Sequence, residues 1–165
     1  MKTTGIVRKI DELGRIVLPK ELRKCLNINT GDDFQIKLED EKIILEKYSY
    51  LKNYEQEIIS IINCFISETS YDISLVINNK IINKNNEIID QKLDRLIQER
   101  KIFECKNIEE LHLNDNLVIE GRYIILPIVV NSDLLGSLIV VSKDNIINIE
   151  KTSKLLLKII KSKFE

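Results

Sequence analysis

The 165-residue sequence contains no tryptophan, a single histidine and only five glycines. The scarcity of histidine and of glycine argues against several classes of enzyme and metal site. His112 has no cysteine or carboxylate at ligand spacing, so nothing predicts a closed zinc site. One histidine and scattered serines give no Ser-His-Asp arrangement beyond chance. The glycines form neither a P-loop nor a dinucleotide-binding motif. We therefore expect no catalytic residue, no metal and no cofactor, and the chain is not predicted to be an enzyme.

Cysteine is also scarce, and Cys25, Cys64 and Cys105 are widely spaced with no CxxC motif. Isolated thiols at apolar positions predict small buried side chains in a reducing compartment, without a structural disulfide. No stretch of about 18 apolar residues could span a membrane, and the N-terminus lacks the apolar core of a signal peptide. The sequence thus predicts a cytoplasmic protein with no membrane partner.

What the sequence does have is a local concentration of positive charge. The whole chain has a formal net charge of −1, but its first 24 residues hold seven basic and three acidic side chains, a balance of +4. The basic residues of this stretch are Lys2, Arg8, Lys9, Arg15, Lys20, Arg23 and Lys24. Phosphate binding requires a concentrated positive face rather than a positive protein, so this stretch is the candidate site for binding nucleic acid.

Short strands are predicted for the N-terminal part of the chain. Alternation over residues 4–10 places Ile6 and Arg8 on one side of a strand and Val7 and Lys9 on the other. After it we predict a turn at 11–14, a strand at 15–18, a helix at 20–26 opened by Pro19, and strands at 34–38 and 43–45 around a turn at 39–42. About 48 residues of short strands bury too little surface to be stable alone, so the pattern asks for a partner chain.

Two adjacent acids lie on the first of these turns and could be mistaken for a catalytic pair. Adjacent residues on a turn usually point apart, so Asp11 and Glu12 do not suit shared acid–base chemistry. We interpret them as a polar turn that orients Arg8 or Arg15.

The ordered string GIVRKIDELGRIVLPKELR resembles the DNA-binding domain of the AbrB family of bacterial transition-state regulators, and the resemblance runs without a gap over residues 1–48. It implies a swapped-hairpin β-barrel, in which two chains exchange hairpins to build one dimeric barrel. It also implies that double-stranded DNA is the partner. The combination of this domain with a larger C-terminal domain resembles one longer member of the family. That member regulates sporulation, and the resemblance to it implies a tetramer.

The resemblance also implies roles for individual residues. The positions that match the family's DNA-contacting basic residues are Arg8, Arg15, Arg23 and Lys24. Position 24 is often arginine in those relatives. Lysine keeps the charge but loses the planar fork, so we expect Lys24 to contact phosphate rather than a base. Lys2 and Lys9 are expected to be flanking phosphate contacts. The alternative is that these side chains are ordinary solvated charges.

The sequence of the remainder of the chain predicts a mixture of strands and helices between two flanking helices. Apolar residues at helical spacing predict a connecting helix at 51–67. We further predict a strand at 73–77, a turn at Asn78-Asn79 leading to 80–82, a helix at 88–100, a hairpin of 122–130 with 135–142, and a helix at 149–164. The wide apolar stripe of the last helix predicts contact with both a sheet and another helix. This order of elements resembles a small GAF domain, a fold that commonly binds small molecules in a pocket over the sheet. Such a pocket would use residues such as Tyr123, Ile125 and Leu126. The alternative is that these residues belong to an apolar core and an oligomer interface.

Together these observations predict an α+β protein with an AbrB-type domain at 1–50 and a GAF-like regulatory and oligomerisation domain at 51–165. The leading hypothesis is a DNA-binding transcriptional regulator of sporulation genes, forming a homodimer and a homotetramer and sensing an unknown ligand. Two other hypotheses remain open. One is an antitoxin that binds DNA and a toxin, and the other is a ligand-sensing oligomer.

Overall fold

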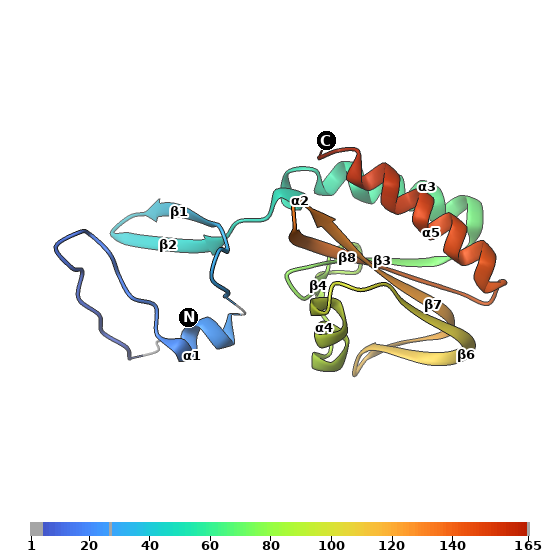
Figure 1. Cartoon of the computed structure of the whole chain (residues 1–165), viewed down its shortest axis with the longest axis horizontal. Coiled ribbons are helices and arrows are strands. Elements are labelled where there is room, and N and C mark those ends of the chain that lie inside the picture. The colour runs from blue at the N-terminus through green and yellow to red at the C-terminus, as the bar shows by residue number, and fades with distance from the viewer. Residues whose placement is uncertain (1–4, 27, 165) are drawn as a thin grey trace. The chain divides into compact units, whose positions relative to one another are not determined.

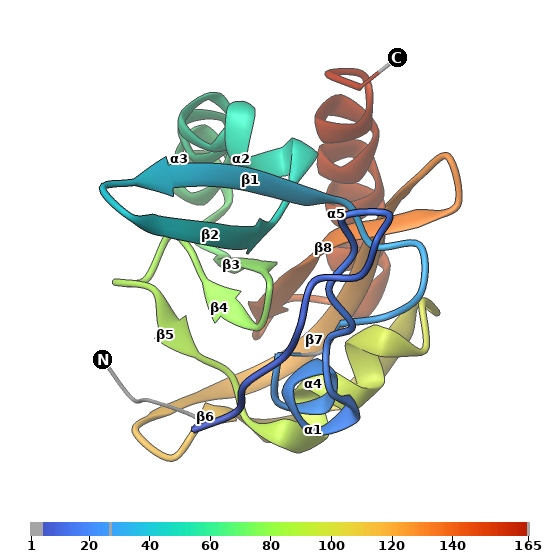
Figure 2. The same ribbon diagram turned by 90° about the vertical axis from the view of Figure 1, so that its left-hand side faces the viewer.

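The computed structural model describes residues 5–26 and 28–164. The chain divides into two compact units, Met1–Tyr48 and Ser49–Glu165. The first unit contains the helix α1 (Lys20–Cys25) and the strands β1 (Phe34–Glu39) and β2 (Lys42–Lys47). β1 and β2 form an antiparallel hairpin in which Phe34 pairs with Lys47 and Glu39 with Lys42 (Figure 1; Figure 2). The predicted helix and the predicted hairpin are therefore confirmed.

The strands predicted at 4–10 and 15–18 are wrong for this structure, because residues 5–18 contain no strand. A strand exists only where a neighbouring chain segment completes its hydrogen-bond ladder. In the described part of the first unit the only ladder is that of β1 and β2. The predicted turn does form: the Gly14 amide donates to the Asp11 carbonyl at 2.9 Å, and Gly14 has φ +76°, a conformation that suits glycine.

The described residues of the first unit form no hydrophobic core of their own. Among its described residues, Pro19 alone is buried. Val7 is 86% exposed and Leu38 is 78% exposed. The other large apolar side chains exposed in this unit are Ile6, Ile10, Leu13, Ile16, Val17, Leu26, Ile36, Ile43 and Leu45. Such a density of exposed apolar surface is characteristic of a site of association.

The second unit is built on a six-stranded antiparallel sheet of order β5-β4-β3-β8-β7-β6. Its strands are β3 (Asp72–Ile77), β4 (Lys80–Ile81), β5 (Glu87–Ile88), β6 (Phe103–Asn114), β7 (Leu117–Val130) and β8 (Asp133–Ser142). Two predicted turns are present, at Asn78-Asn79 and at Asn131-Ser132, where all four residues have positive φ. Paired positive φ values give the hairpin turns that match strand twist, and asparagine tolerates them.

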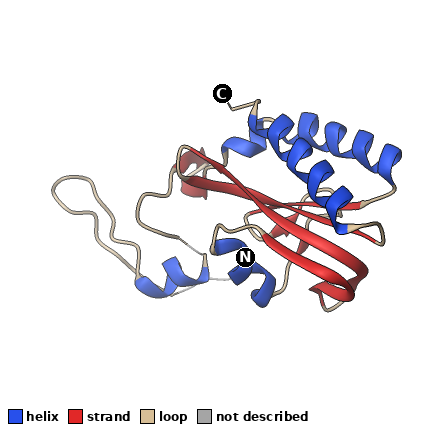
Figure 3. Cartoon of the chain, turned by 45° about the vertical axis from the view of Figure 1, so that its right-hand side comes forward, coloured by secondary structure: helices blue, strands red, loops and turns tan. Residues whose placement is uncertain are grey.

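The helices of this unit are α2 (Tyr50–Asn53), α3 (Glu55–Thr69), α4 (Gln91–Gln98) and α5 (Ile146–Lys161). α3 and α5 lie along one face of the sheet, and α4 lies on the other (Figure 1; Figure 3). The first face packs Ile58 and Ile62 of α3 with Leu156 and Ile160 of α5 onto the sheet. The prediction that the last helix contacts a sheet and another helix together is confirmed.

Several predicted boundaries were wrong, and each has a local cause. The connecting helix predicted at 51–67 is interrupted at Tyr54, whose amide donates to Leu51 only three residues back, so two helices form. The helix predicted at 88–100 begins at Gln91, because the Asp90 side chain accepts the amides of Lys92 and Leu93. The helix predicted from 149 begins earlier, at Ile146, behind the Asn145 cap.

Two further features differ from the sequence prediction. β6 was not predicted from the sequence, because its apolar and polar residues alternate poorly and most of its residues are exposed. The cysteines are not buried: Cys25 and Cys64 are exposed and Cys105 is half-buried, and all three are free thiols. Cys64 lies on α3, whose buried face is filled by isoleucine instead.

Candidate nucleic-acid interface

The candidate interface occupies the segment 5–18 and the helix α1. The described basic residues that the sequence singled out all have exposed side chains: Arg8, Lys9, Arg15, Arg23 and Lys24. Lys2 lies outside the described residues. Exposure keeps the full charge of these groups available to a polyanion, which is the first requirement for binding a phosphate backbone.

α1 positions two of these residues. Pro19 precedes the helix with φ −57°, and its carbonyl accepts the Arg23 amide at 3.0 Å. Arg23 and Lys24, which are adjacent in sequence, lie in the last turn of this helix, where the helix dipole interacts favourably with positive charge. The backbone therefore holds two adjacent cations at the end of a short helix.

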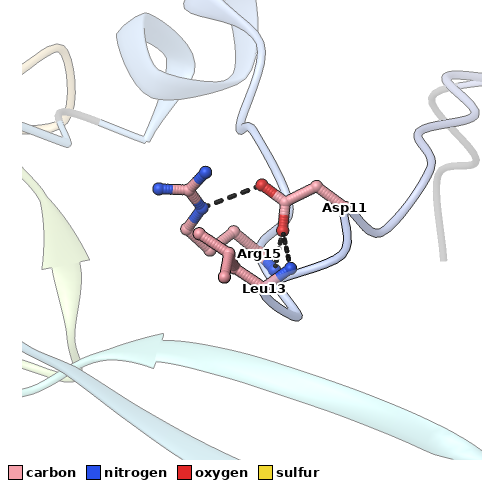
Figure 4. A network of polar contacts seen from close by, with 3 residues as sticks. All are labelled: Asp11, Leu13 and Arg15. Atoms are coloured by element: carbon pink, nitrogen blue, oxygen red, sulfur yellow. Dashed lines mark hydrogen bonds and ion pairs between the residues drawn. The ribbon is translucent and has the colours of Figure 1, made fainter.

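The turn at 11–15 positions a third basic residue, Arg15. One carboxylate oxygen of Asp11, Oδ1, accepts the backbone amides of Leu13 at 3.0 Å and of Arg15 at 2.8 Å. The other oxygen, Oδ2, accepts Nε of the Arg15 guanidinium at 2.8 Å (Figure 4). The Asp11 amide also donates to the Arg15 carbonyl at 3.0 Å, which closes the turn. The prediction that the acidic turn orients an arginine is confirmed for Asp11 and Arg15.

These contacts explain the charge state of Asp11. Its pKa is held below the ordinary value of 3.8, first by the hydrogen bond from the Arg15 backbone amide and then by that from the Arg15 side chain; desolvation opposes them, and the Leu13 amide lowers the pKa by less than desolvation raises it. Hydrogen bonds donated to a carboxylate favour its ionised form. Asp11 is therefore a carboxylate at any physiological pH, and the ion pair with Arg15 persists under those conditions.

The ligand pocket predicted in the second unit does not assemble as expected. Leu126 packs on the α3 and α5 face of the sheet, whereas Ile125 and Tyr123 pack on the opposite face with α4. Neighbouring residues of a strand point to opposite faces, so these three side chains cannot line one cavity. His112 is exposed, with Nε2 3.6 Å from a Glu110 carboxylate oxygen.

Sequence reasoning missed two structural contacts in this unit. Arg122 donates to three carbonyls, those of Lys106 at 3.1 Å, Lys143 at 2.8 Å and Asp144 at 3.1 Å. The available signal was an arginine placed directly before the long apolar run of β7. Leu51 packs against Gly136 of β8, and that contact had no signal in the sequence.

Residues 5–26 and 28–164 contain neither a candidate metal site nor a candidate membrane-spanning helix. Across this described part, no group of three or more histidine, cysteine or acidic side chains could hold a metal ion. None of the helices described there is long and apolar enough to cross a membrane.

Comparison with known proteins places the chain. It is 30% identical over 154 residues to stage V sporulation protein T of Bacillus subtilis (strain 168), covering 87% of this chain and 86% of the relative. The chain belongs to the stage V sporulation protein T family. Neither this relative nor a second one, the transition state regulatory protein AbrB of the same organism, is named as an enzyme, in agreement with the prediction from the sequence.

The N-terminal unit also matches shorter proteins. Over 48 residues the chain is 62% identical to the transition state regulatory protein AbrB of Bacillus subtilis (strain 168), covering 29% of this chain and 50% of AbrB. Residues 7–53 match the family model "Antidote-toxin recognition MazE, bacterial antitoxin". The solution structure of the N-domain of the transcription factor abrB has 62% sequence identity, covers 29% of this chain and 92% of its own, and gives a TM-score of 0.28.

Proposed function

We propose that the chain is a DNA-binding regulator of transcription that acts on promoter DNA of sporulation genes in the cytoplasm. The observation that carries the proposal is the 62% identity of the basic N-terminal segment to AbrB, whose N-terminal region has a solved structure titled a DNA recognition domain. The exposed arginines of that segment support it, because a planar guanidinium binds phosphate or a guanine edge with two hydrogen bonds.

In this proposal Arg8, Arg15 and Arg23 contact DNA directly. Lys24, Lys9 and Lys2 contact phosphates, since an ammonium supplies charge without the fork of arginine. The contacts would confer both affinity and register, while base readout would come from the arginines.

We propose further that two chains build one swapped-hairpin barrel from residues 1–50. The support is the near-absence of buried side chains in the first unit and its many exposed aliphatic residues. Residues 5–18 have strand-like sequence but no strand partner within the described chain, and a second chain would supply that ladder. Burial in the dimer would then provide the core that one chain does not have.

For the second unit we propose a GAF-like role in oligomerisation and ligand sensing. Its support is the order of elements, an antiparallel sheet with α3 and α5 on one face and α4 on the other. We propose that α3 and α5 join two dimers into a tetramer, which would raise DNA affinity through effective concentration. The sensing of an unidentified small molecule stays a prediction.

The test is a fluorescence anisotropy titration of the full chain with an AT-rich promoter duplex and a scrambled duplex across a salt series. We expect tight binding that weakens steeply with salt, and a gap between the two duplexes. Arg15→Ala should weaken binding to the promoter duplex by at least tenfold, given about 1–3 kcal/mol for a bidentate base contact in each chain of a dimer. Arg95→Ala, an exposed arginine on α4, is the matched control and should leave affinity unchanged.

The antitoxin hypothesis is supported by the match of residues 7–53 to the MazE model. Against it, the second unit folds around two apolar clusters, whereas a toxin-wrapping tail is usually disordered before binding. A ligand-sensing oligomer without DNA affinity is the other outcome of the titration. Absence of binding to both duplexes at low salt would contradict the proposed function and favour that alternative.

A further inference from the structure

The two oxygens of the Asp11 carboxylate have different partners. Oδ1 accepts the backbone amides of Leu13 and Arg15, and so holds the turn. Oδ2 accepts Nε of the Arg15 guanidinium at 2.8 Å. One side chain thus performs two separable tasks, one on the backbone and one on a cation that the proposed function assigns to DNA.

The nitrogen used by Asp11 decides how Arg15 is presented. Arginine has five N–H donors, and Nε carries only one of them. The two terminal nitrogens carry the other four, and the ion pair with Asp11 is made through Nε (Figure 4). They form the edge that makes a bidentate pair with a guanine or a phosphate. Although its inner nitrogen is paired, the Arg15 side chain remains 70% exposed.

The Asp11–Arg15 ion pair contributes little to the stability of the fold. Ion pairs between exposed side chains contribute little, because water and salt screen them. What such a pair does change is freedom of motion, since a long side chain that is already held in one orientation loses less entropy on binding.

We propose that Asp11 is a positioning residue that sets the DNA sequence discrimination of the protein by holding the Arg15 guanidinium in its base-reading orientation. This inference rests on the proposed DNA binding. Asp11 adds a negative charge beside the phosphate backbone, and that charge opposes binding to every sequence alike. Its orienting effect favours only the duplex whose bases Arg15 can read. Asp11 therefore lowers affinity for unrelated DNA and raises affinity for the operator.

The substitution that separates the two tasks is Asp11→Asn. Asparagine keeps an acceptor oxygen for the amides of Leu13 and Arg15, but its amide nitrogen cannot accept the Nε proton. Glu12→Gln is the matched control, because it removes the same charge from the neighbouring exposed position. Among the described residues, Glu12 takes no part in the Asp11–Arg15 ion pair.

The experiment measures full-chain affinity for an operator duplex and a scrambled duplex at one salt concentration. Asp11→Asn should lower the ratio of the two affinities about tenfold, within the range of a bidentate base contact, by weakening operator binding and strengthening scrambled binding. Glu12→Gln should strengthen both and leave the ratio unchanged. In an Arg15→Ala background, Asp11→Asn should no longer lower the ratio, because the residue it acts through is gone.

A spectroscopic measurement makes the result independent of DNA. The Arg15 Nε–H signal of the free protein should be protected from exchange with water in the wild type and in Glu12→Gln, and unprotected in Asp11→Asn. An unchanged affinity ratio in Asp11→Asn, when the wild type prefers its operator, would overturn the role of Asp11 alone. Equal weakening on both duplexes would assign Asp11 to the fold of the turn instead. A wild type that binds neither duplex would refute the proposed function itself.

Discussion

Replacement of Leu51 by alanine tests how α2 is attached to the second unit. Leu51 is 0% exposed, and it belongs to the apolar cluster formed by α3, α5 and the sheet. A leucine-to-alanine change at a fully buried site costs about 2–5 kcal/mol, and because α2 is short and can relax into the space we expect about 3 kcal/mol. At about 4 °C per kcal/mol for a domain of roughly this size, the melting temperature should fall by about 12 °C.

The assay is urea unfolding followed by far-UV circular dichroism, at a fixed protein concentration because the proposed association contributes to stability. Ile88→Ala is the control, since that side chain is 59% exposed on β5 and should change the free energy of unfolding by less than about 1 kcal/mol. A loss from Leu51→Ala no larger than that of Ile88→Ala would refute the reasoning. It would mean that α2 is not docked on the sheet.

Gly136 gives the same contact a second test. A Cβ at this position would lie 2.5 Å from the Val76 carbonyl oxygen and 2.9 Å from Cδ1 of Leu51. Gly136→Ala should therefore destabilise the unit by about 1–3 kcal/mol or more, because it overpacks a close backbone approach. In the Leu51→Ala background the clash with the side chain disappears while that with the carbonyl remains. The two substitutions should then be less destabilising together than the sum of the single effects.

Three further outcomes follow from contacts described above. Because the pKa of Asp11 is lowered from its ordinary value of 3.8, the Asp11–Arg15 ion pair should be intact at neutral pH and should be lost as the pH falls through the lowered pKa; protection of the Arg15 Nε–H signal, measured against pH, checks this. Burial, and then the hydrogen bond to Asp144, raises the pKa of Tyr71 above 10.0. The stability that the protonated hydroxyl contributes is therefore present below pH 10 and is lost as the pH rises through the raised pKa. Tyr71→Phe should remove this pH dependence of the free energy of unfolding, as measured by urea titrations. A fragment of residues 1–50 should still dimerise in light scattering but bind the promoter duplex at least tenfold more weakly than the full chain, because linked barrels raise effective concentration; equal affinities would refute the avidity argument.

Local chemistry explains which elements were predictable from sequence. The hairpin turns at Asn78-Asn79 and Asn131-Ser132 were found because positive φ needs particular residue types. α1 was found because Pro19 marks its start. The helix boundary at Asp90 was missed because capping competes with helical periodicity, and the Asp90 side chain decides that competition by accepting two amides of the following turn.

The candidate site was predictable to a different degree. Charge and order along the chain indicated the basic segment and the orienting role of the acidic turn, whereas the individual DNA-contacting residues were assigned through the resemblance to the AbrB family. Which carboxylate oxygen binds which group depends on the closed backbone of 11–15, and a sequence does not encode it visibly. The residues suggested for a ligand pocket do not share one cavity for a simpler reason: Ile125 and Leu126 are neighbours on a strand and belong to opposite apolar clusters.

The described N-terminal residues bury only Pro19, and this has a consequence for the chain as a gene product. If the core of that unit forms only when two chains meet, then the folding of the unit is second order in chain concentration. A newly made copy without a mate would expose its aliphatic side chains to proteases, while paired copies would be protected. The abundance of the protein would then act as a threshold, below which its first unit has no defined structure and above which it accumulates.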